Sequence, residues 1–237
     1  MKIEIWSDVM CPFCYIGKRH FEKALEGFPG KADIEVEWKS FQLNPDMETA
    51  PGRHINEYLA EKKGWTVEQA RQANEYVTGM AAAAGLQYDM DQAVVANSFD
   101  AHRMIQLAKS LGKGDIMEEN LFRAYFTEGK NIADHHTLTG LAENAGIDRE
   151  KAAAVLAGDQ FQDAVEKDLY EAQQIGVRGV PFFVLNNHYA VSGAQPVEAF
   201  TGAITTAWQE WKQGKPLSPD AGENTGKSCP AEGNCQE

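Results

Sequence analysis

Two cysteines three positions apart, Cys11 and Cys14, stand where an apolar strand pattern gives way to an amphipathic helix pattern. The strand pattern covers residues 2–6 and the helix pattern covers residues 11–26. Positions i and i+3 of a helix share one face, so the two sulfur atoms can come close enough to form a disulfide. The order strand, Cys-x-x-Cys, helix therefore predicts an α/β protein that carries dithiol–disulfide chemistry at the start of its first helix.

The helix start predicts different roles for the two thiols. Cys11 falls in the first turn, where unpaired N–H groups and the positive end of the helix dipole stabilise a thiolate. Cys14 lies one turn deeper, and we expect it to be the less exposed, resolving thiol. Pro12 suits the first turn because a proline there gives up an N–H that has no partner in the helix. Two alternatives for a Cys-x-x-Cys pair remain open, namely purely structural thiols and half of a zinc site.

Composition and charge narrow the class of protein. The chain has 237 residues, 43% of them hydrophobic, which suffices for one large domain or two small ones. A formal net charge of −13 argues against nucleic acid and anionic membranes as partners. There is no signal-peptide pattern and no apolar run of membrane-spanning length, so we expect a cytoplasmic protein. In such a protein, four cysteines favour catalytic or metal-binding use over a disulfide scaffold.

The remaining sequence changes from strand to helix periodicity and back. Residues 34–39 alternate apolar and charged side chains and predict a second strand that continues to about residue 42, with a loop at residues 45–53. Capping residues and terminal glycines then predict helices over about 66–85, 98–112, 115–128, 134–146, 148–158 and 161–175. Residues 182–185 and 189–191 predict a β-hairpin that turns at two asparagines, and a last helix runs from Pro196 to about Trp211.

This order predicts one sheet built from the two ends of the chain, with a block of helices inserted between them. We assign residues 1–50 and 177–214 to the sheet-forming domain and residues 51–176 to a helical insertion domain. Residues 215–237 are rich in Pro, Gly and Ser and poor in apolar residues, so we expect a flexible tail.

Four segments carry a resemblance to a known family, namely SDVMCPFCY at 7–15, NSFDAHR at 97–103, GVPFF at 179–183 and SGAQP at 192–196. With these segments the chain resembles the DsbA family, and within it the FrnE-like cytoplasmic branch. The resemblance implies an α/β, thioredoxin-like fold with a large helical insertion. It implies that Cys11 is the nucleophile, that Cys14 is the resolving cysteine and that Pro181 is a cis-proline facing the active site. Val180 would then offer its backbone groups to an extended substrate segment.

The function expected from these features is that of a dithiol–disulfide oxidoreductase or isomerase acting on protein or peptide thiols. Exchange would pass through a mixed disulfide at Cys11 that Cys14 resolves, without a metal or organic cofactor and with an electron donor or acceptor still to be identified. Phe13 is a candidate substrate contact. The alternative is a glutathione-dependent transferase or isomerase of the same superfamily. Its members generally carry serine where Cys11 stands, so the presence of both cysteines favours electron transfer.

A second cysteine pair lies in the tail. Five residues separate Cys229 from Cys235, a spacing compatible with a loop disulfide but too long for a helical Cys-x-x-Cys pair. As an accessory redox pair, these cysteines would exchange electrons with Cys11 and Cys14. The alternatives are an inert tail and a zinc site that uses all four thiols.

Overall fold

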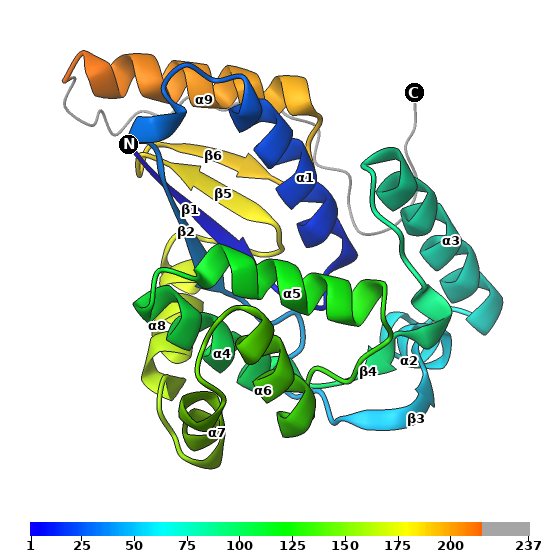
Figure 1. Cartoon of the computed structure of the whole chain (residues 1–237). Helices are drawn as coiled ribbons and strands as arrows, with labels where there is room; N and C mark the ends of the chain where they lie inside the picture. The colour runs from blue at the N-terminus through cyan, green and yellow to red at the C-terminus, as the bar shows by residue number, and fades with distance from the viewer. Residues whose placement is uncertain (215–237) are drawn as a thin grey trace.

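A four-stranded sheet forms the centre of the computed structural model, which describes residues 1–214. The strands lie in the order β2, β1, β5, β6 (Figure 1). β1 is parallel to β2 and antiparallel to β5, and β6 is antiparallel to β5. The two ends of the described chain therefore share one sheet, as predicted, with Ile3 of β1 opposite Leu185 of β5. The strands are β1 (Lys2–Ser7), β2 (Glu35–Ser40), β5 (Phe182–Leu185) and β6 (Tyr189–Ser192).

Helices cover both faces of the sheet and also form a separate block. α1 and α9 lie side by side on one face, α8 packs on the other, and α2 to α7 gather beyond the carboxyl end of β1 (Figure 1). Short 3-10 turns occupy Lys31–Asp33 and Met90–Gln92. The helices are α1 (Pro12–Glu26), α2 (Ile55–Lys63), α3 (Val67–Ala83), α4 (Phe99–Ser110), α5 (Gly114–Phe126), α6 (His135–Asn144), α7 (Arg149–Ala157), α8 (Gln162–Gln174) and α9 (Val197–Lys212).

Alternate side chains of the strands explain this layering. Phe183 of β5 faces α1 and α9, with its ring centre 5.4 Å from that of Phe21 and 4.6 Å from that of Phe200. Trp6 of β1 turns to the opposite face, where it packs in the cluster that includes α8, and its indole N–H donates to the Asp168 carbonyl at 3.0 Å. Because successive side chains of a strand point to opposite faces, both faces of this sheet are apolar and both need a helical cover.

Predicted helix starts are confirmed where a capping side chain marks them. Thr66 forms a complete capping box at the start of α3. Asp134 and Asp148 accept backbone N–H groups at the starts of α6 and α7. The hairpin asparagines, Asn186 and Asn187, have φ values of 55° and 56°, as the predicted turn requires.

The predicted loop at residues 45–53 is wrong in its second half. β3 (Ala50–His54) lies there and pairs antiparallel with β4 (Val94–Val95), with an irregularity in the register. β3 contains Pro51 and Gly52, and β4 has only two residues, so neither segment shows the alternation from which strands are recognised. The pairing joins segments far apart in sequence and leaves no local signal.

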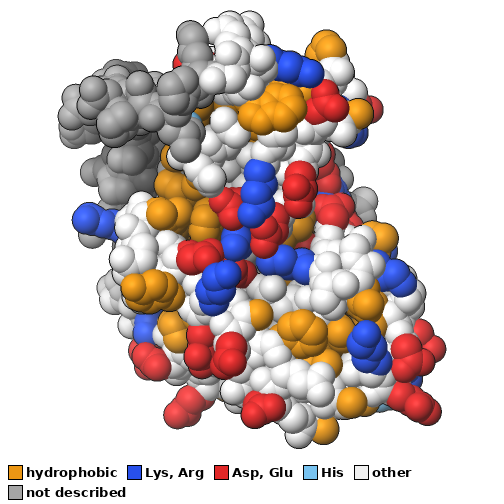
Figure 2. All heavy atoms as spheres, turned by 90° about the vertical axis from the view of Figure 1, so that its left-hand side faces the viewer, with side chains coloured by type: hydrophobic (Ala, Val, Ile, Leu, Met, Phe, Trp, Pro, Cys, Tyr) orange, Lys and Arg blue, Asp and Glu red, His pale blue; other side chains and the backbone are white. Residues whose placement is uncertain are grey.

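Charged side chains of both signs alternate over the face shown in Figure 2, which is the left-hand side of Figure 1. β2 contributes to a mixed network in which the Lys39 ammonium lies 3.2 Å from the Asp168 carboxylate and 2.9 Å from that of Glu171. On the described part of this face, basic and acidic side chains are mixed (Figure 2). Among residues 1–214, no helix is long and apolar enough to cross a membrane.

Candidate active site

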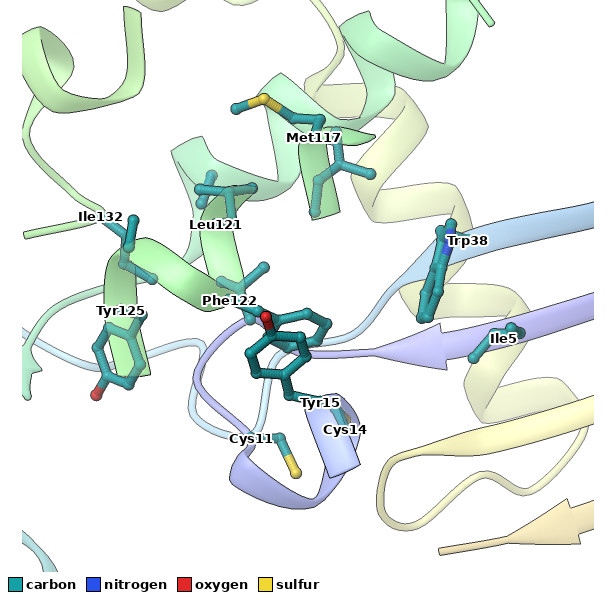
Figure 3. Packing of buried hydrophobic residues seen from close by; sticks show 14 of the residues in the cluster. Ile5, Cys11, Cys14, Tyr15, Trp38, Met117, Leu121, Phe122, Tyr125 and Ile132 are labelled. Atoms are coloured by element: carbon teal, nitrogen blue, oxygen red, sulfur yellow. The ribbon is translucent and has the colours of Figure 1, made fainter. Parts of the chain in front are cut away.

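The first turn of α1 brings together Cys11 and Cys14, the two cysteines predicted to be redox-active, beyond the end of β1 (Figure 3). Cys11 is the N-cap residue of α1, and the backbone N–H of Cys14 donates to its carbonyl at 2.9 Å. Both thiols are free, and only 3% of Cys11 and 1% of Cys14 is exposed. Cys14 is the less exposed, as predicted, but the difference is small. The two thiols therefore differ by their surroundings more than by their access to solvent.

Cys11 faces the segment that leads into β5. Its thiol donates to the Val180 carbonyl oxygen at a distance of 3.4 Å. The Val180–Pro181 peptide bond is cis, as the resemblance implied. α1 approaches this segment closely, because a Cβ atom placed on Gly17 would lie 2.9 Å from Cγ of Pro181. Glycine is therefore the residue that this contact between α1 and the proline ring allows.

Cys14 is held as a neutral thiol. Burial raises the pKa of the Cys14 thiol well above its ordinary value, and the adjacent Cys11 raises it further. Interactions with the Asp8 backbone and the Ser7 hydroxyl oppose this rise without cancelling it. Cys14 therefore keeps its proton at neutral pH and must release it before it can act as a nucleophile.

A buried carboxyl group from α5 reaches the same place. The Ser7 hydroxyl, at the end of β1, donates to Oε1 of Glu118 at 2.8 Å. Burial raises the pKa of Glu118 to about 7, although His102 and Ser7 act in the opposite direction. A carboxyl group that titrates near neutrality can both accept and return a proton. Ser7 therefore stands between Cys14 and a group suited to proton transfer.

Asp8 shapes the loop that leads into Cys11. Its carboxylate accepts the backbone N–H of Met10 at 3.2 Å and that of Leu43 at 2.8 Å. His102 of α4, which belongs to one of the family-like segments, is buried with Nε2 3.5 Å from the Asp8 carboxylate. Neither ring nitrogen of His102 has a hydrogen-bond partner among the described residues. The side chains of Asp8 and His102 thus lie close together next to the loop that precedes Cys11.

An aromatic stack joins the active-site turn to the helical block. Tyr15 of α1 stacks on Phe122 of α5 with ring centres 4.8 Å apart (Figure 3). Tyr88, from the segment after α3, stacks on Phe126 with ring centres 4.6 Å apart and donates its hydroxyl to the Pro12 carbonyl at 2.7 Å. Sequence reasoning missed Tyr88, because no local pattern places this residue beside the cysteines.

Charged side chains also fix α1 against α5. Lys18 is buried, and its ammonium lies 3.1 Å from the Asp115 carboxylate and 3.3 Å from that of Glu119. Arg19 pairs with Glu119 as well. Burial favours the neutral amine of Lys18, but the surrounding carboxylates outweigh it and raise the pKa of this group. Lys18 is therefore a buried cation whose charge depends on Glu22 of its own helix and on its partners from α5.

Two of the other predicted site residues, Phe13 and Val180, lie near Cys11. Phe13 is 40% exposed and Val180 is half-buried beside Cys11, so both can border a bound substrate. Cys229 and Cys235 lie outside the described residues, so the accessory pair stays a prediction. Within residues 1–214, no group of three or more His, Cys, Asp or Glu side chains is arranged to hold a metal ion.

Known proteins share the sequence and the fold of this chain to different extents. A family model described as a DSBA-like thioredoxin domain matches residues 2–205. The structure of a probable DsbA oxidoreductase from Streptomyces coelicolor is 41% identical, with a TM-score of 0.85, over 92% of this chain and 93% of that chain. Protein YwbO of Bacillus subtilis (strain 168) is 29% identical over 205 residues, which are 86% of this chain and 95% of that protein. The cytosolic disulfide reductase DsbM from Pseudomonas aeruginosa shares the fold, with a TM-score of 0.61 and 16% identity over 90% of this chain and 98% of that chain.

Proposed function

Because the chain belongs to the DsbA-like thioredoxin family, we propose that it is a dithiol–disulfide oxidoreductase or isomerase that acts on protein or peptide thiols. One observation carries this proposal. The N-cap residue of α1, Cys11, carries a free thiol, and a second free thiol, Cys14, lies in the same turn and stays protonated. We expect the helix start to stabilise the thiolate of Cys11, while Cys14 remains a protonated thiol until it resolves the mixed disulfide.

The first step is attack of the Cys11 thiolate on a substrate disulfide. A bond forms between the Cys11 sulfur and one substrate sulfur, the substrate disulfide breaks, and the other substrate sulfur leaves as a thiolate that takes a proton from water. The exposed Phe13 ring gives an apolar contact beside the reacting sulfur. Backbone groups of Val180 pair with an extended substrate segment as an added strand.

In the second step Cys14 resolves the mixed disulfide. The Cys14 thiol passes its proton through the Ser7 hydroxyl to the Glu118 carboxylate. The Cys14 sulfur then bonds to the Cys11 sulfur, and the second substrate thiolate leaves. Two electrons have moved from the cysteine pair to the substrate, and the reverse sequence oxidises a substrate dithiol. An external thiol or disulfide returns the pair to its starting state, and the exchange requires no metal or organic cofactor.

Single-cysteine variants test this assignment. We expect Cys11→Ser to abolish both insulin reduction and disulfide formation in a reduced test substrate, because it removes the nucleophile. Cys14→Ser should instead accumulate mixed disulfides, visible as adducts on a non-reducing gel that disappear with dithiothreitol. The double variant is the control and should form no adduct. Full activity of Cys11→Ser would exclude the assignment, and adducts formed only by Cys11→Ser would reverse the two roles.

The glutathione-dependent transferase or isomerase is the competing activity. Such an enzyme binds glutathione noncovalently and keeps its activity without Cys14. Calorimetry of the wild type with S-methylglutathione, which cannot form a disulfide, separates the two. Binding in the micromolar range together with activity in Cys14→Ser would favour the glutathione enzyme, whereas absence of heat supports protein dithiol exchange.

The compartment that we propose is the cytoplasm. The cytosolic reductase DsbM has the same fold, and a reducing compartment of that kind keeps protein thiols reduced. Fractionation of cells followed by immunoblotting tests this placement, and recovery of the protein outside the cytoplasmic fraction would contradict it.

A further inference from the structure

The first turn of α1 leaves one N–H group without a backbone acceptor among the described residues. Cys11 has extended backbone angles, with φ −88° and ψ 110°, and its side chain makes no capping hydrogen bond while it is a thiol. An N-cap side chain accepts from the second or third N–H of its helix, which here belong to Phe13 and Cys14. The Cys14 N–H already donates to the Cys11 carbonyl. The Phe13 N–H has no backbone acceptor within residues 1–214.

Tyr88 binds the other end of that same peptide group. The carbonyl of Pro12 and the N–H of Phe13 belong to one peptide unit, and the Tyr88 hydroxyl donates to this carbonyl at 2.7 Å. A hydrogen bond to the carbonyl of an amide polarises the whole unit, so its N–H becomes a stronger donor. A Cys11 thiolate that accepts the Phe13 N–H would complete a chain of hydrogen bonds from the Tyr88 hydroxyl through the Pro12–Phe13 peptide to the sulfur.

The residues on both sides of Tyr88 hold it in place. The Gln87 carbonyl accepts the Thr127 hydroxyl at 2.6 Å, and the Asp89 N–H donates to the Phe126 carbonyl at 2.7 Å. Both anchors lie at the end of α5. Burial raises the pKa of Tyr88, and the nearby Cys11 and Cys14 raise it further, so the phenol remains a donor over the range in which thiols titrate.

We propose that Tyr88 is a positioning residue that stabilises the Cys11 thiolate through the Pro12–Phe13 peptide, so that the helical insertion sets how oxidising the cysteine pair is. This inference rests on the proposed function, because it needs Cys11 as the reactive thiolate. A more stable thiolate favours the reduced pair over the disulfide, and therefore makes the disulfide the stronger oxidant.

Tyr88→Phe tests the proposal, with Tyr15→Phe as the matched control. Both changes remove one hydroxyl from the same aromatic stack, but the Tyr15 hydroxyl donates to Glu119 at 2.6 Å and not to the active-site turn. The measurement is the equilibrium between the cysteine pair and glutathione buffers of known ratio, followed by the mass shift of alkylated thiols. Tyr88→Phe should shift this equilibrium toward the Cys11–Cys14 disulfide by about two- to fivefold, the effect of one modest hydrogen bond. The rate at which iodoacetamide alkylates Cys11 at pH 7 should fall in parallel.

Tyr15→Phe should leave both quantities within about 1.5-fold of wild type. The Tyr15 hydroxyl binds Glu119 and does not contact a peptide group of the active-site turn. An unchanged equilibrium in Tyr88→Phe, or equal shifts in the two variants, would overturn the proposal. Failure of the proposed function has a different signature. In that case Cys11→Ser would be alkylated as rapidly as wild type. Cys11 would then not be the reactive thiol, and the effects of the two tyrosine variants would have another cause.

Discussion

The stability of the protein should depend on pH through Glu118, and Glu118→Gln should remove this dependence. Burial raises the pKa of Glu118 to about 7 in the folded protein, whereas a glutamate in an unfolded chain titrates near ~4.3. Between these two values the folded protein holds a proton that the unfolded chain has lost, so the free energy of unfolding falls as pH rises. Below about pH 4 both states are protonated and above about pH 8 neither is, so the slope is confined to this window.

The size of the effect follows from the two pKa values. A gap of about 2.7 units, at roughly 1.4 kcal/mol per unit, corresponds to about 3–4 kcal/mol between pH 4 and pH 8. Glutamine is neutral at all these pH values and still offers an oxygen to the Ser7 hydroxyl. Wild type and Glu118→Gln should therefore be similar near pH 4, and the variant should become the more stable by about 3 kcal/mol at pH 8.

Urea unfolding of the reduced full-length protein, followed by circular dichroism at half-unit steps of pH, measures this difference. Glu119→Gln is the matched control, because the pKa of Glu119 shifts in the opposite direction to that of Glu118. Burial acts to raise the pKa of Glu119, but Arg19 and Tyr15 overcome it and lower that pKa. A lowered pKa stabilises the folded state above the unfolded value, so Glu119→Gln should lose stability at neutral pH. Equal slopes for wild type and Glu118→Gln between pH 5 and pH 8 would refute the raised pKa of Glu118.

Four further substitutions test packing, ion pairing and helix capping. Gly17→Ala should cost about 1–3 kcal/mol in urea unfolding, because its Cβ would lie 2.9 Å from Pro181. Gly79→Ala, in α3 with no atom within 4 Å of the new Cβ, should gain about 0.5–1 kcal/mol, and a gain at both sites would contradict the close approach at Gly17. Lys18→Met leaves the carboxylates of α5 without their buried cation and should cost about 1–3 kcal/mol, so a loss below about 0.5 kcal/mol would show that this pairing is unimportant. Thr66→Ala removes the capping box of α3 and should cost about 1 kcal/mol, and an unchanged melting temperature would show that α3 frays independently of the core.

The parts of the site that the sequence predicts are those with a local signal. Cys11 and Cys14 lie within one helical turn of each other, directly after a strand, so their proximity follows from the helix alone. The hairpin after Pro181 is likewise local, because two adjacent asparagines supply its turn. The cis bond at Pro181 came from the family resemblance and not from any physical pattern in the sequence.

The groups that surround these cysteines could not be predicted in the same way. Glu118 and Glu119 are adjacent in α5, and successive residues point about 100° apart around a helix. One of the two therefore lies in the core and the other in a charged cluster, but both look like ordinary surface glutamates in the sequence. Tyr88 and the β3–β4 pair depend in the same way on contacts between distant segments. Contacts of the helical block with α1 and β2, and contacts of β3 and β4 with α2 inside the block, determine them.

The pairing of β1 with β5 determines when this chain can complete its active site during synthesis. Ile3 pairs with Leu185, and a ribosome adding about 5–20 residues per second needs roughly 10–40 s to pass from one to the other. During that time β1 and β2 form at most a two-stranded pair, which is marginal by itself. The Val180 carbonyl that accepts the Cys11 thiol has not yet been made. In a nascent chain the two thiols therefore lack the cover of the β5 segment, and we expect them to be more accessible to thiols and oxidants than in the folded protein.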